Sequence, residues 1–281
     1  MTTYDPVSGT ESAYPVINIV SMMAWGLGYF GMPHILLRFM AIEDEKKLSL
    51  SRRVATTWVV ISLAVAVMIG VIGLGMTEAG KLEMLQGSNS ETIIVKIADL
   101  LSTYGVLPAL LGGTILAGIL ASTMSTADSQ LLAASSAVSS DLLGRIIKKD
   151  KKESMLADRI TLLLIAVVAV IIARNPDSSV FNIVSFAWAG FGAVFGPVVL
   201  FALFWRRTNW QGALAGMISG GVMVFVWKYL VRPNVSFLNF YELLPAFLVS
   251  CAMIVIVSLA TKAPSKEIID EFETVQKRMA E

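Results

Sequence analysis

Seven stretches of this sequence are apolar and long enough to cross a lipid bilayer, and they constrain the fold more than any other feature. Of the 281 residues, 56% are hydrophobic and only 15% are charged, whereas a soluble domain carries about a quarter. Because backbone in lipid must satisfy its own hydrogen bonds, the pattern predicts an all-α, polytopic membrane helical bundle. The predicted spans cover approximately residues 14–40, 53–77, 106–142, 156–174, 179–205, 210–231 and 241–262.

Basic residues are concentrated in alternate connections between these spans. The connections after the first, third, fifth and seventh spans are rich in Lys and Arg, and the intervening ones are poorer. Basic loops stay in the cytoplasm, so the sequence predicts a cytoplasmic C-terminus and an N-terminus outside. Residues 1–13 are polar and do not resemble a signal peptide. An N-terminus outside the cell with no span before it favours a truncated or split chain.

Composition argues against several classes of function. The net charge of +1 gives no electrostatic reason to expect nucleic-acid binding. Cys251 is the only cysteine and His34 the only histidine, so a cysteine cluster or a histidine-based metal site is hard to build. The sequence also has no phosphate-binding loop and no nucleophile elbow. An enzyme is therefore not expected.

Polar side chains interrupt the third apolar stretch. Hydroxyls recur at helical spacing, at Ser122, Ser125, Ser129, Ser136 and Ser140. Thr126 and Asp128 lie beside this stripe. A carboxylate in hydrocarbon must face protein, water or an ion, and oxygen ligands suit a hard cation. Small hydroxylated residues also allow helices to pack closely, which is the interpretation we favour for Ser136 and Ser140. The remaining group favours a cation site, formed by Ser122, Ser125, Thr126 and Asp128.

The first span contains the sequence Trp25-Gly-Leu-Gly-Tyr-Phe-Gly-Met-Pro33-His34. Three glycines and a proline make a continuous helix improbable, and a broken span is the best sequence indicator of a transporter binding site. Trp25 and Tyr29 are four residues apart, so they would line one face of a helix. Where the backbone around Gly28 and Gly31 is unwound, its amides and carbonyls could hydrogen-bond to a substrate. A simple proline kink with ordinary aromatic packing is the alternative.

Two further segments are rich in small residues. The run Trp188–Pro197 has small residues at Ala189, Gly192, Ala193 and Gly196, and we interpret it as a packing and bending element that does not bind substrate. Gly212–Gly216 is likewise interpreted as a packing face. Residues 91–102 predict a short amphipathic helix, and the charged residues from 264 onward predict a solvated, partly frayed helix.

Taken together, these motifs resemble the sodium:solute symporter family. The matching residues begin with the broken segment from Trp25 to His34 and continue with Arg38-Phe-Met40. They then include Met124-Ser-Thr126 with Ser129-Gln-Leu-Leu132, Ser185–Ala193 with Phe195-Gly-Pro-Val-Val199, and Gly212-Ala-Leu-Ala-Gly-Met217. The matches cover nearly the whole chain in order.

The resemblance implies the second inverted repeat of a five-plus-five, LeuT-like transporter core, followed by two additional helices. The implied organisation is a polar extracellular lead-in (1–13), five core transmembrane helices (14–205), two peripheral ones (206–262) and a charged cytoplasmic tail (263–281). The first repeat, which supplies the other half of the main sodium site in this family, has no counterpart. A missing N-terminal half is therefore an expected partner.

The resemblance also implies roles for individual residues. Sodium would bind the Ser122 carbonyl and the hydroxyls of Ser125 and Thr126, and a second sodium would bind Asp128 and Ser129. Substrate contacts would fall on Trp25, Tyr29 and Pro33. Met32 is a departure, because proline transporters of the family usually have glutamine there.

The expected function is sodium-coupled symport of proline across the cell membrane, with sodium as the co-transported ion. A carrier for another small solute, such as pantothenate or a different amino acid, is the alternative within the family. A membrane sensor module derived from the family is the alternative from another class.

Overall fold

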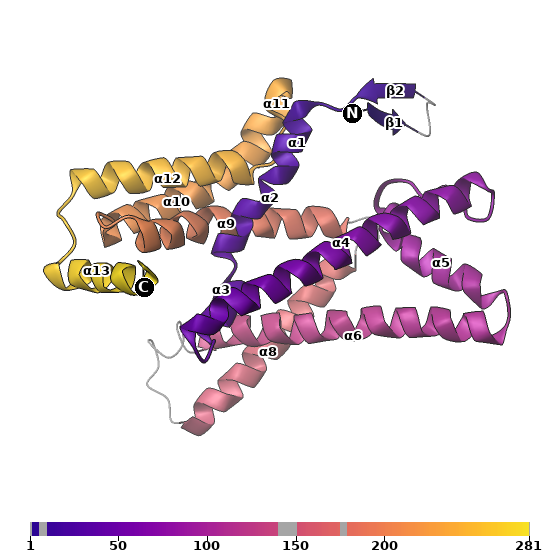
Figure 1. Ribbon diagram of the computed structural model, residues 1–281, viewed down its shortest axis with the longest axis horizontal. Helices are drawn as coiled ribbons and strands as arrows, with labels where there is room; N and C mark the ends of the chain where they lie inside the picture. Colours follow the sequence, from indigo (N-terminus) through magenta and orange to yellow (C-terminus); the bar gives the residue numbers. More distant parts are fainter. Residues whose placement is uncertain (1, 6–9, 140–150, 175–178, 281) are drawn as a thin grey trace. The chain divides into compact units, whose positions relative to one another are not determined.

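The computed structural model describes residues 2–5, 10–139, 151–174 and 179–280 (Figure 1). The predicted spans form helices, which confirms the all-α membrane bundle. One short hairpin lies in the segment predicted as a polar lead-in, where β1 (Thr2–Asp5) pairs antiparallel with β2 (Thr10–Ala13). The chain divides into two compact units, Met1–Met40 with Ile183–Glu281 (unit 1) and Ala41–Asn182 (unit 2). Each is described in turn.

Unit 1 contains the first predicted span and the last three. The first span consists of α1 (Val16–Met23), α2 (Trp25–Gly28), the 3-10 turn η1 (Tyr29–Gly31) and α3 (Pro33–Met40). The C-terminal part begins with α9 (Val180–Phe204), whose first residues belong to unit 2, and α10 (Trp210–Val226). These are followed by the π-helical turn η5 (Trp227–Val231), α11 (Arg232–Asn234), η6 (Ser236–Leu238), α12 (Leu243–Ala260) and α13 (Lys266–Ala280).

Unit 2 is built around two long helices with a short helix between them in the chain. Its elements are η2 (Glu45–Lys47), α4 (Leu48–Glu78), η3 (Gly87–Thr92), α5 (Ile93–Ser102), α6 (Val106–Ser136) and α8 (Lys151–Ala173). The predicted amphipathic helix is confirmed as α5, which packs against α6 where Gly112 lets the Ala98 carbonyl approach closely. Ile93 of α5 fits against Gly73 of α4 in the same way.

Five helices of the described chain are long and apolar enough to cross a membrane, namely those ending at Glu78, Ser139, Phe204, Asn234 and Ala260. A sixth candidate is the pair Val16–Gly31 and Pro33–Met40, which is bent by 50° at its break. The predicted fourth span also forms a helix, α8, although it is not among these candidates. The chain is therefore a multi-pass membrane protein, as its sequence predicts.

Helices α10 and α12 lie side by side, and α10 brings a row of glycines to the contact (Figure 1). Gly212 faces Ser258, Gly216 faces Ile254, and Gly220 faces the Ala193 carbonyl and Ser250. Close approach of this kind replaces the hydrophobic effect as the source of helix association in lipid. The packing role predicted for Gly212–Gly216 is thus confirmed.

Adding one methyl group at Gly220 is expected to destabilise unit 1. A Cβ there would lie 2.5 Å from the Ala193 carbonyl oxygen and 3.0 Å from Ser250 Cβ, so backbone would have to move. Such overpacking costs about 1–3 kcal/mol, and thermal unfolding in detergent should show a lower melting temperature for Gly220→Ala. The matched control is Gly221→Ala, whose Cβ would make only a 3.4 Å contact with Val194. Equal melting temperatures for the two variants would contradict this prediction.

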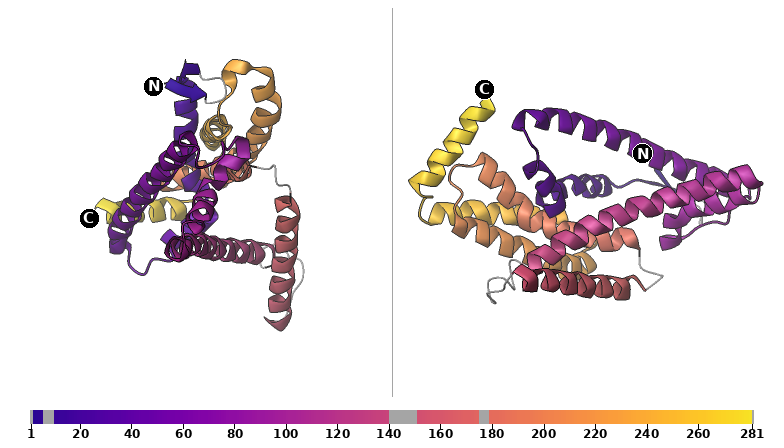
Figure 2. Two further views of the ribbon diagram at one scale, coloured as in Figure 1. Left: turned by 90° about the vertical axis from the view of Figure 1, so that its right-hand side faces the viewer. Right: turned by 90° about the horizontal axis from the view of Figure 1, so that it is seen from below.

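The C-terminal helix contacts the end of α9 and the residues that follow it. After α12 the chain turns back into α13 (Figures 1 and 2). Arg206 pairs with Glu273 at 2.9 Å, and the Gln276 side-chain amide donates to the Leu203 carbonyl at 3.1 Å. The predicted charged helix is confirmed as α13, and most of its described side chains are exposed, while these two contacts join it to the end of α9 and the residues that follow.

In unit 2, the carboxylate of Glu91 caps the beginning of α9. It accepts hydrogen bonds from the Ser179 hydroxyl at 2.6 Å, from the Val180 amide at 3.1 Å and from the Phe181 amide at 3.4 Å. A negative charge at a helix N-terminus is favourable because the unpaired amides point toward it. The Ser179 hydroxyl, followed by the two amides, holds the pKa of Glu91 below its ordinary value.

The Glu91 cap should make the stability of unit 2 depend on pH. Because the pKa of Glu91 is lower in the folded chain than in the unfolded chain, its contribution is present above the ordinary value of 4.5 and is lost as the pH falls through the folded value. Glu91→Gln should therefore lower the melting temperature at pH 7, and the difference should shrink below a pH of about 4. Glu83→Gln, an exposed neighbour in the same connection, is the control. A pH-independent difference would show that the charge is not responsible.

Candidate substrate and cation sites

The first span breaks at Met32, as the sequence predicts for this region. The 3-10 turn ends at Gly31, and Met32 adopts an extended conformation with φ −82° and ψ 115°. Pro33 then begins α3, where its missing amide is not needed and its fixed φ suits a helix. The residue before a proline is disfavoured in the helical region, which explains why the break falls on Met32.

The interruption is narrower than the sequence suggests. Gly28 has helical angles of φ −66° and ψ −29°, and Gly31 closes the 3-10 turn, so neither supplies an unwound backbone. Both glycines instead allow close packing. A Cβ on Gly28 would overlap the Trp188 indole, and a Cβ on Gly31 would lie 2.9 Å from the Gly192 Cα. The hydrogen-bonding role expected for the backbone of these two glycines is therefore not supported by their conformation.

Three aromatic side chains meet beside the break. The Trp25 ring stacks on the Trp188 ring with 5.3 Å between centroids and 16° between planes, and Tyr29 meets Trp188 edge-on at 4.9 Å. The Trp188 indole N–H also donates to the Trp25 carbonyl at 3.0 Å. Trp188 is only 9% exposed, whereas Tyr29 is 48% exposed. Trp188 thus forms a buried support that fixes both residues predicted to contact substrate.

Tyr241 extends this stack from the connection before α12. Its ring lies 5.9 Å from that of Trp25, its amide donates to the Ser21 hydroxyl at 2.8 Å, and its phenol donates to the Ser185 carbonyl at 2.6 Å. Tyr241 thereby connects α1, the aromatic stack and α9.

The structure brings two of the three predicted substrate residues together. Trp25 and Tyr29 both contact Trp188, whereas Pro33 is exposed at the start of α3, after the break. Neither Trp188 nor Tyr241 was assigned to this site from the sequence. Trp188 lies in a run interpreted only as packing, although its aromatic character next to glycines was a usable signal. Tyr241 is the first residue of the predicted seventh span, and in the structure it precedes α12.

The predicted cation ligands lie on α6 in unit 2. Thr126 donates its hydroxyl to the Ser122 carbonyl, with 3.1 Å between the oxygens, and the Ser129 hydroxyl donates to the Ser125 carbonyl at 2.8 Å. Two oxygens 3.1 Å apart can both bind one hard cation, since metal–oxygen distances in calcium sites are about 2.3–2.6 Å. Ser122 and Thr126 also line a shallow cavity of about 330 Å³.

Some of the remaining polar residues along this helix are exposed, and others contact α8. Ser125, Asp128 and Ser129 are exposed. Packing by hydroxyls does occur further along, where Ser135 donates to the Asp158 carbonyl at 2.8 Å and Ser139 donates to the Asp158 carboxylate.

The sequence predicts helix packing at Ser136 and Ser140, whereas two other serines make the contacts with Asp158 described above. Ser136 is exposed, so the prediction that it packs against another helix is wrong, and the contact is made by its neighbour Ser135. Ser140 lies outside the described residues. The stripe of hydroxyls was correctly placed on a helix, but its packed face is rotated by one residue.

Comparisons with known proteins agree with these features. The family model for the sodium:solute symporter family matches residues 3–220. The sodium/proline symporter of Salmonella typhimurium is 41% identical over 259 residues, covering 91% of this chain and 50% of that protein. The sodium/proline symporter of Escherichia coli is 41% identical over 268 residues, covering 94% of this chain and 50% of that protein. Sodium/proline symporter 2 of Staphylococcus saprophyticus is 38% identical over 274 residues, covering 95% of this chain and 52% of that protein.

The chain spans about half the length of the curated relatives it matches. No solved structure matches it. The match to the family model covers well over half of the chain and includes the broken span, the hydroxyls of α6 and the Trp188 region. The chain therefore belongs to the sodium:solute symporter family.

Proposed function

We propose that this chain takes part in sodium-coupled symport of proline across the cell membrane. The observation that carries the proposal is the aromatic cluster at the break of the first span, where Trp188 holds Trp25 and Tyr29. A binding site beside a discontinuous helix is the usual arrangement in secondary transporters. The names of the curated relatives supply the solute and the ion.

Proline suits an aromatic wall of this kind. It is a compact zwitterion with an apolar ring, so its site needs a flat apolar surface, a few polar groups and exclusion of water. Tyr29 meets the Trp188 ring edge-on, is 48% exposed and carries a hydroxyl. Met32 is 9% exposed and packs in the core with Trp188, so it supplies no polar group to a solute. A site for another small solute, such as pantothenate or a different amino acid, is the alternative.

Sodium is proposed to bind α6 through the Ser122 carbonyl and the hydroxyls of Ser125 and Thr126. The Ser122 and Thr126 oxygens lie 3.1 Å apart, which is close enough for both to bind one ion, although other threonines of α6 make the same bond to their own helix. Asp128 and Ser129 are proposed to serve a second sodium. Three oxygens from one helix are fewer than the six or more that a hard cation takes, so further ligands must come from elsewhere. We propose that they come from the part of the family fold that this chain does not cover.

The same proposal includes orientation and organisation. The lysine- and arginine-rich connections favour a cytoplasmic C-terminus. Residues 14–205 would form the second repeat of the transporter core, and 206–262 would form two peripheral helices. The close α10–α12 pair supports treating these two helices as one packing element.

The test uses this chain joined to the portion of the Escherichia coli sodium/proline symporter that it does not cover, called the joined protein below. It is reconstituted in liposomes and supplied with radiolabelled proline under an inward sodium or potassium gradient. Concentrative uptake is expected with sodium only, and the unjoined chain is expected to show none. Uptake that is insensitive to sodium would contradict the proposed coupling. Competition by pantothenate, but not by unlabelled proline, would favour the alternative solute.

A further inference from the structure

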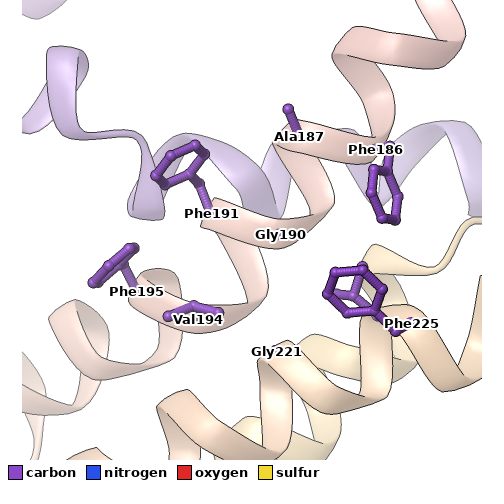
Figure 3. Close-up of a pocket in the computed structure, with 9 residues that line it drawn as sticks. Phe186, Ala187, Gly190, Phe191, Val194, Phe195, Gly221 and Phe225 are labelled. Carbon is purple, nitrogen blue, oxygen red and sulfur yellow. The ribbon is translucent and has the colours of Figure 1, made fainter. Parts of the chain in front are cut away.

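An apolar groove lies between α9 and α10 in unit 1 (Figure 3). Its volume is about 290 Å³, and all of its lining residues are apolar. Both helices are candidate membrane spans, so a groove on their surface opens into hydrocarbon or against another helix. The lining residues used below are Phe186, Gly190, Val194, Phe195, Gly221 and Phe225.

Two glycines create this space. A Cβ added to Gly190 would meet no atom within 4 Å, and one added to Gly221 would meet only Val194, at 3.4 Å. These glycines differ from Gly192 and Gly220, whose added Cβ atoms would collide with neighbouring backbone. The groove is therefore left open by residues that are not needed for packing within unit 1.

A cationic cluster lies next to one of the residues that line the groove, Phe186. The Lys228 ammonium lies 3.8 Å from the centroid of Phe186, which also forms an edge-to-face contact with Phe225 at 5.5 Å. Glu242 is 2% exposed and lies 3.9 Å from the Lys228 nitrogen and 3.3 Å from an Arg232 nitrogen. Two cations thus face one carboxylate. The Lys228–Glu242 distance is longer than a hydrogen bond, so it leaves the ammonium able to donate to another anion.

The lining residues of α9 extend over more than two helical turns. Phe186 and Phe195 are nine residues apart, which corresponds to about 14 Å along the helix axis at 1.5 Å per residue. Lys228 lies over Phe186, so it is near the end of the groove that is farther from Phe195.

We propose that this groove binds one acyl chain of an anionic phospholipid, whose phosphate is held by Lys228 and Arg232. The apolar walls supply affinity for the chain, and the excess positive charge selects an anionic headgroup over a zwitterionic one. Lys228 is placed for this role because its ammonium lies over the ring of Phe186, a residue that lines the groove. The groove adjoins the aromatic cluster around Trp25, because Phe186 packs against the core that contains Trp188.

The experiment is photolabelling of the 281-residue chain in nanodiscs of phosphatidylcholine and phosphatidylglycerol. The probe is phosphatidylglycerol with a photoreactive acyl chain, and labelled peptides are quantified by mass spectrometry. Label is expected on residues 186–195 and 221–225. Unlabelled phosphatidylglycerol should compete better than phosphatidylcholine, and free glycerol phosphate should not compete.

Four variants separate the two parts of the site. Lys228→Gln should reduce labelling about fivefold. This change corresponds to roughly 1 kcal/mol, the contribution of one basic residue near an anionic lipid. Lys228→Arg should retain the labelling. Gly190→Leu should abolish labelling by filling the groove. Gly70→Leu is its matched control, because a Cβ at this α4 glycine also meets no atom within 4 Å.

Two outcomes would overturn the proposal. Equal labelling by phosphatidylcholine and phosphatidylglycerol probes, unchanged in Lys228→Gln, would show ordinary lipid contact without headgroup selection. Absence of label from the groove in the unmodified chain would show that another protein segment covers it. Melting temperatures of the variants are measured in parallel, so that a loss of label counts only for variants that remain folded.

Discussion

Thr126→Val in the joined protein is expected to raise the sodium concentration that gives half-maximal proline uptake by about tenfold or more. The substitution keeps the branched shape of the side chain and removes one oxygen from the proposed ion site. A polar contact to a charged group contributes about 1.5–3 kcal/mol, and 1.4 kcal/mol corresponds to a factor of ten. Ser125→Ala should have a similar effect, whereas Thr126→Ser, which keeps the hydroxyl, should have little.

Two control variants distinguish ion binding from helix packing. Thr114→Val removes a hydroxyl that is exposed on the same helix and bonds its own backbone at 2.8 Å, as Thr126 does at 3.1 Å. Ser136→Ala removes an exposed hydroxyl further along α6. Both should leave the sodium dependence unchanged. If all four deletion variants share one sodium dependence, the α6 hydroxyls do not bind the ion, and their function is structural.

The features that could be predicted from the sequence are those with a strong local cause. The break at Met32 follows from a proline that cannot continue a helix and from the restriction it places on the preceding residue. The glycine face of α10 follows from the need for close approach in lipid. The membrane spans follow from hydrophobicity and length alone.

The features that were missed depend on contacts between distant parts of the chain. Tyr241 reaches the site through a loop, and it is positioned by Ser21 and Ser185, which lie 220 and 56 residues away in sequence. Ser136 was predicted to pack, whereas its neighbour Ser135 makes the contact, because a stripe of hydroxyls does not reveal which of its edges meets α8. The glycines at 28 and 31 suggested unwinding but serve close packing against α9.

These contacts also indicate how substrate and α9 would be linked. Trp25 stacks on Trp188, which also accepts the edge of Tyr29 and donates to the Trp25 carbonyl. Any rearrangement of the broken span must therefore carry α9 with it or break this hydrogen bond and stack. In the proposed symporter, if bound sodium raises the affinity for proline, then bound proline must raise the affinity for sodium by the same factor.

Trp25→Ala in the joined protein is expected to weaken proline binding about tenfold or more when sodium is present. The substitution removes the aromatic wall and leaves a void beside Trp188 and Tyr241, which lie 5.3 and 5.9 Å from the Trp25 ring. Truncating a central aromatic anchor typically costs 2 kcal/mol or more, well above the 1.4 kcal/mol of a tenfold change. Trp25→Phe should retain most of the affinity. The measurement is a scintillation proximity assay with radiolabelled proline, with and without sodium.

Sodium binding in the absence of proline decides whether Trp25 acts on the substrate or on the fold. Because a residue that acts only through contact with the substrate makes no such contact when proline is absent, Trp25→Ala should then leave sodium affinity unchanged. A variant that is merely misfolded should lose both. Trp210→Ala is the matched control, since Trp210 is 71% exposed at the start of α10 and has no predicted role in binding. Proline affinity that is indifferent to both sodium and Trp25 would place the substrate site elsewhere in the protein.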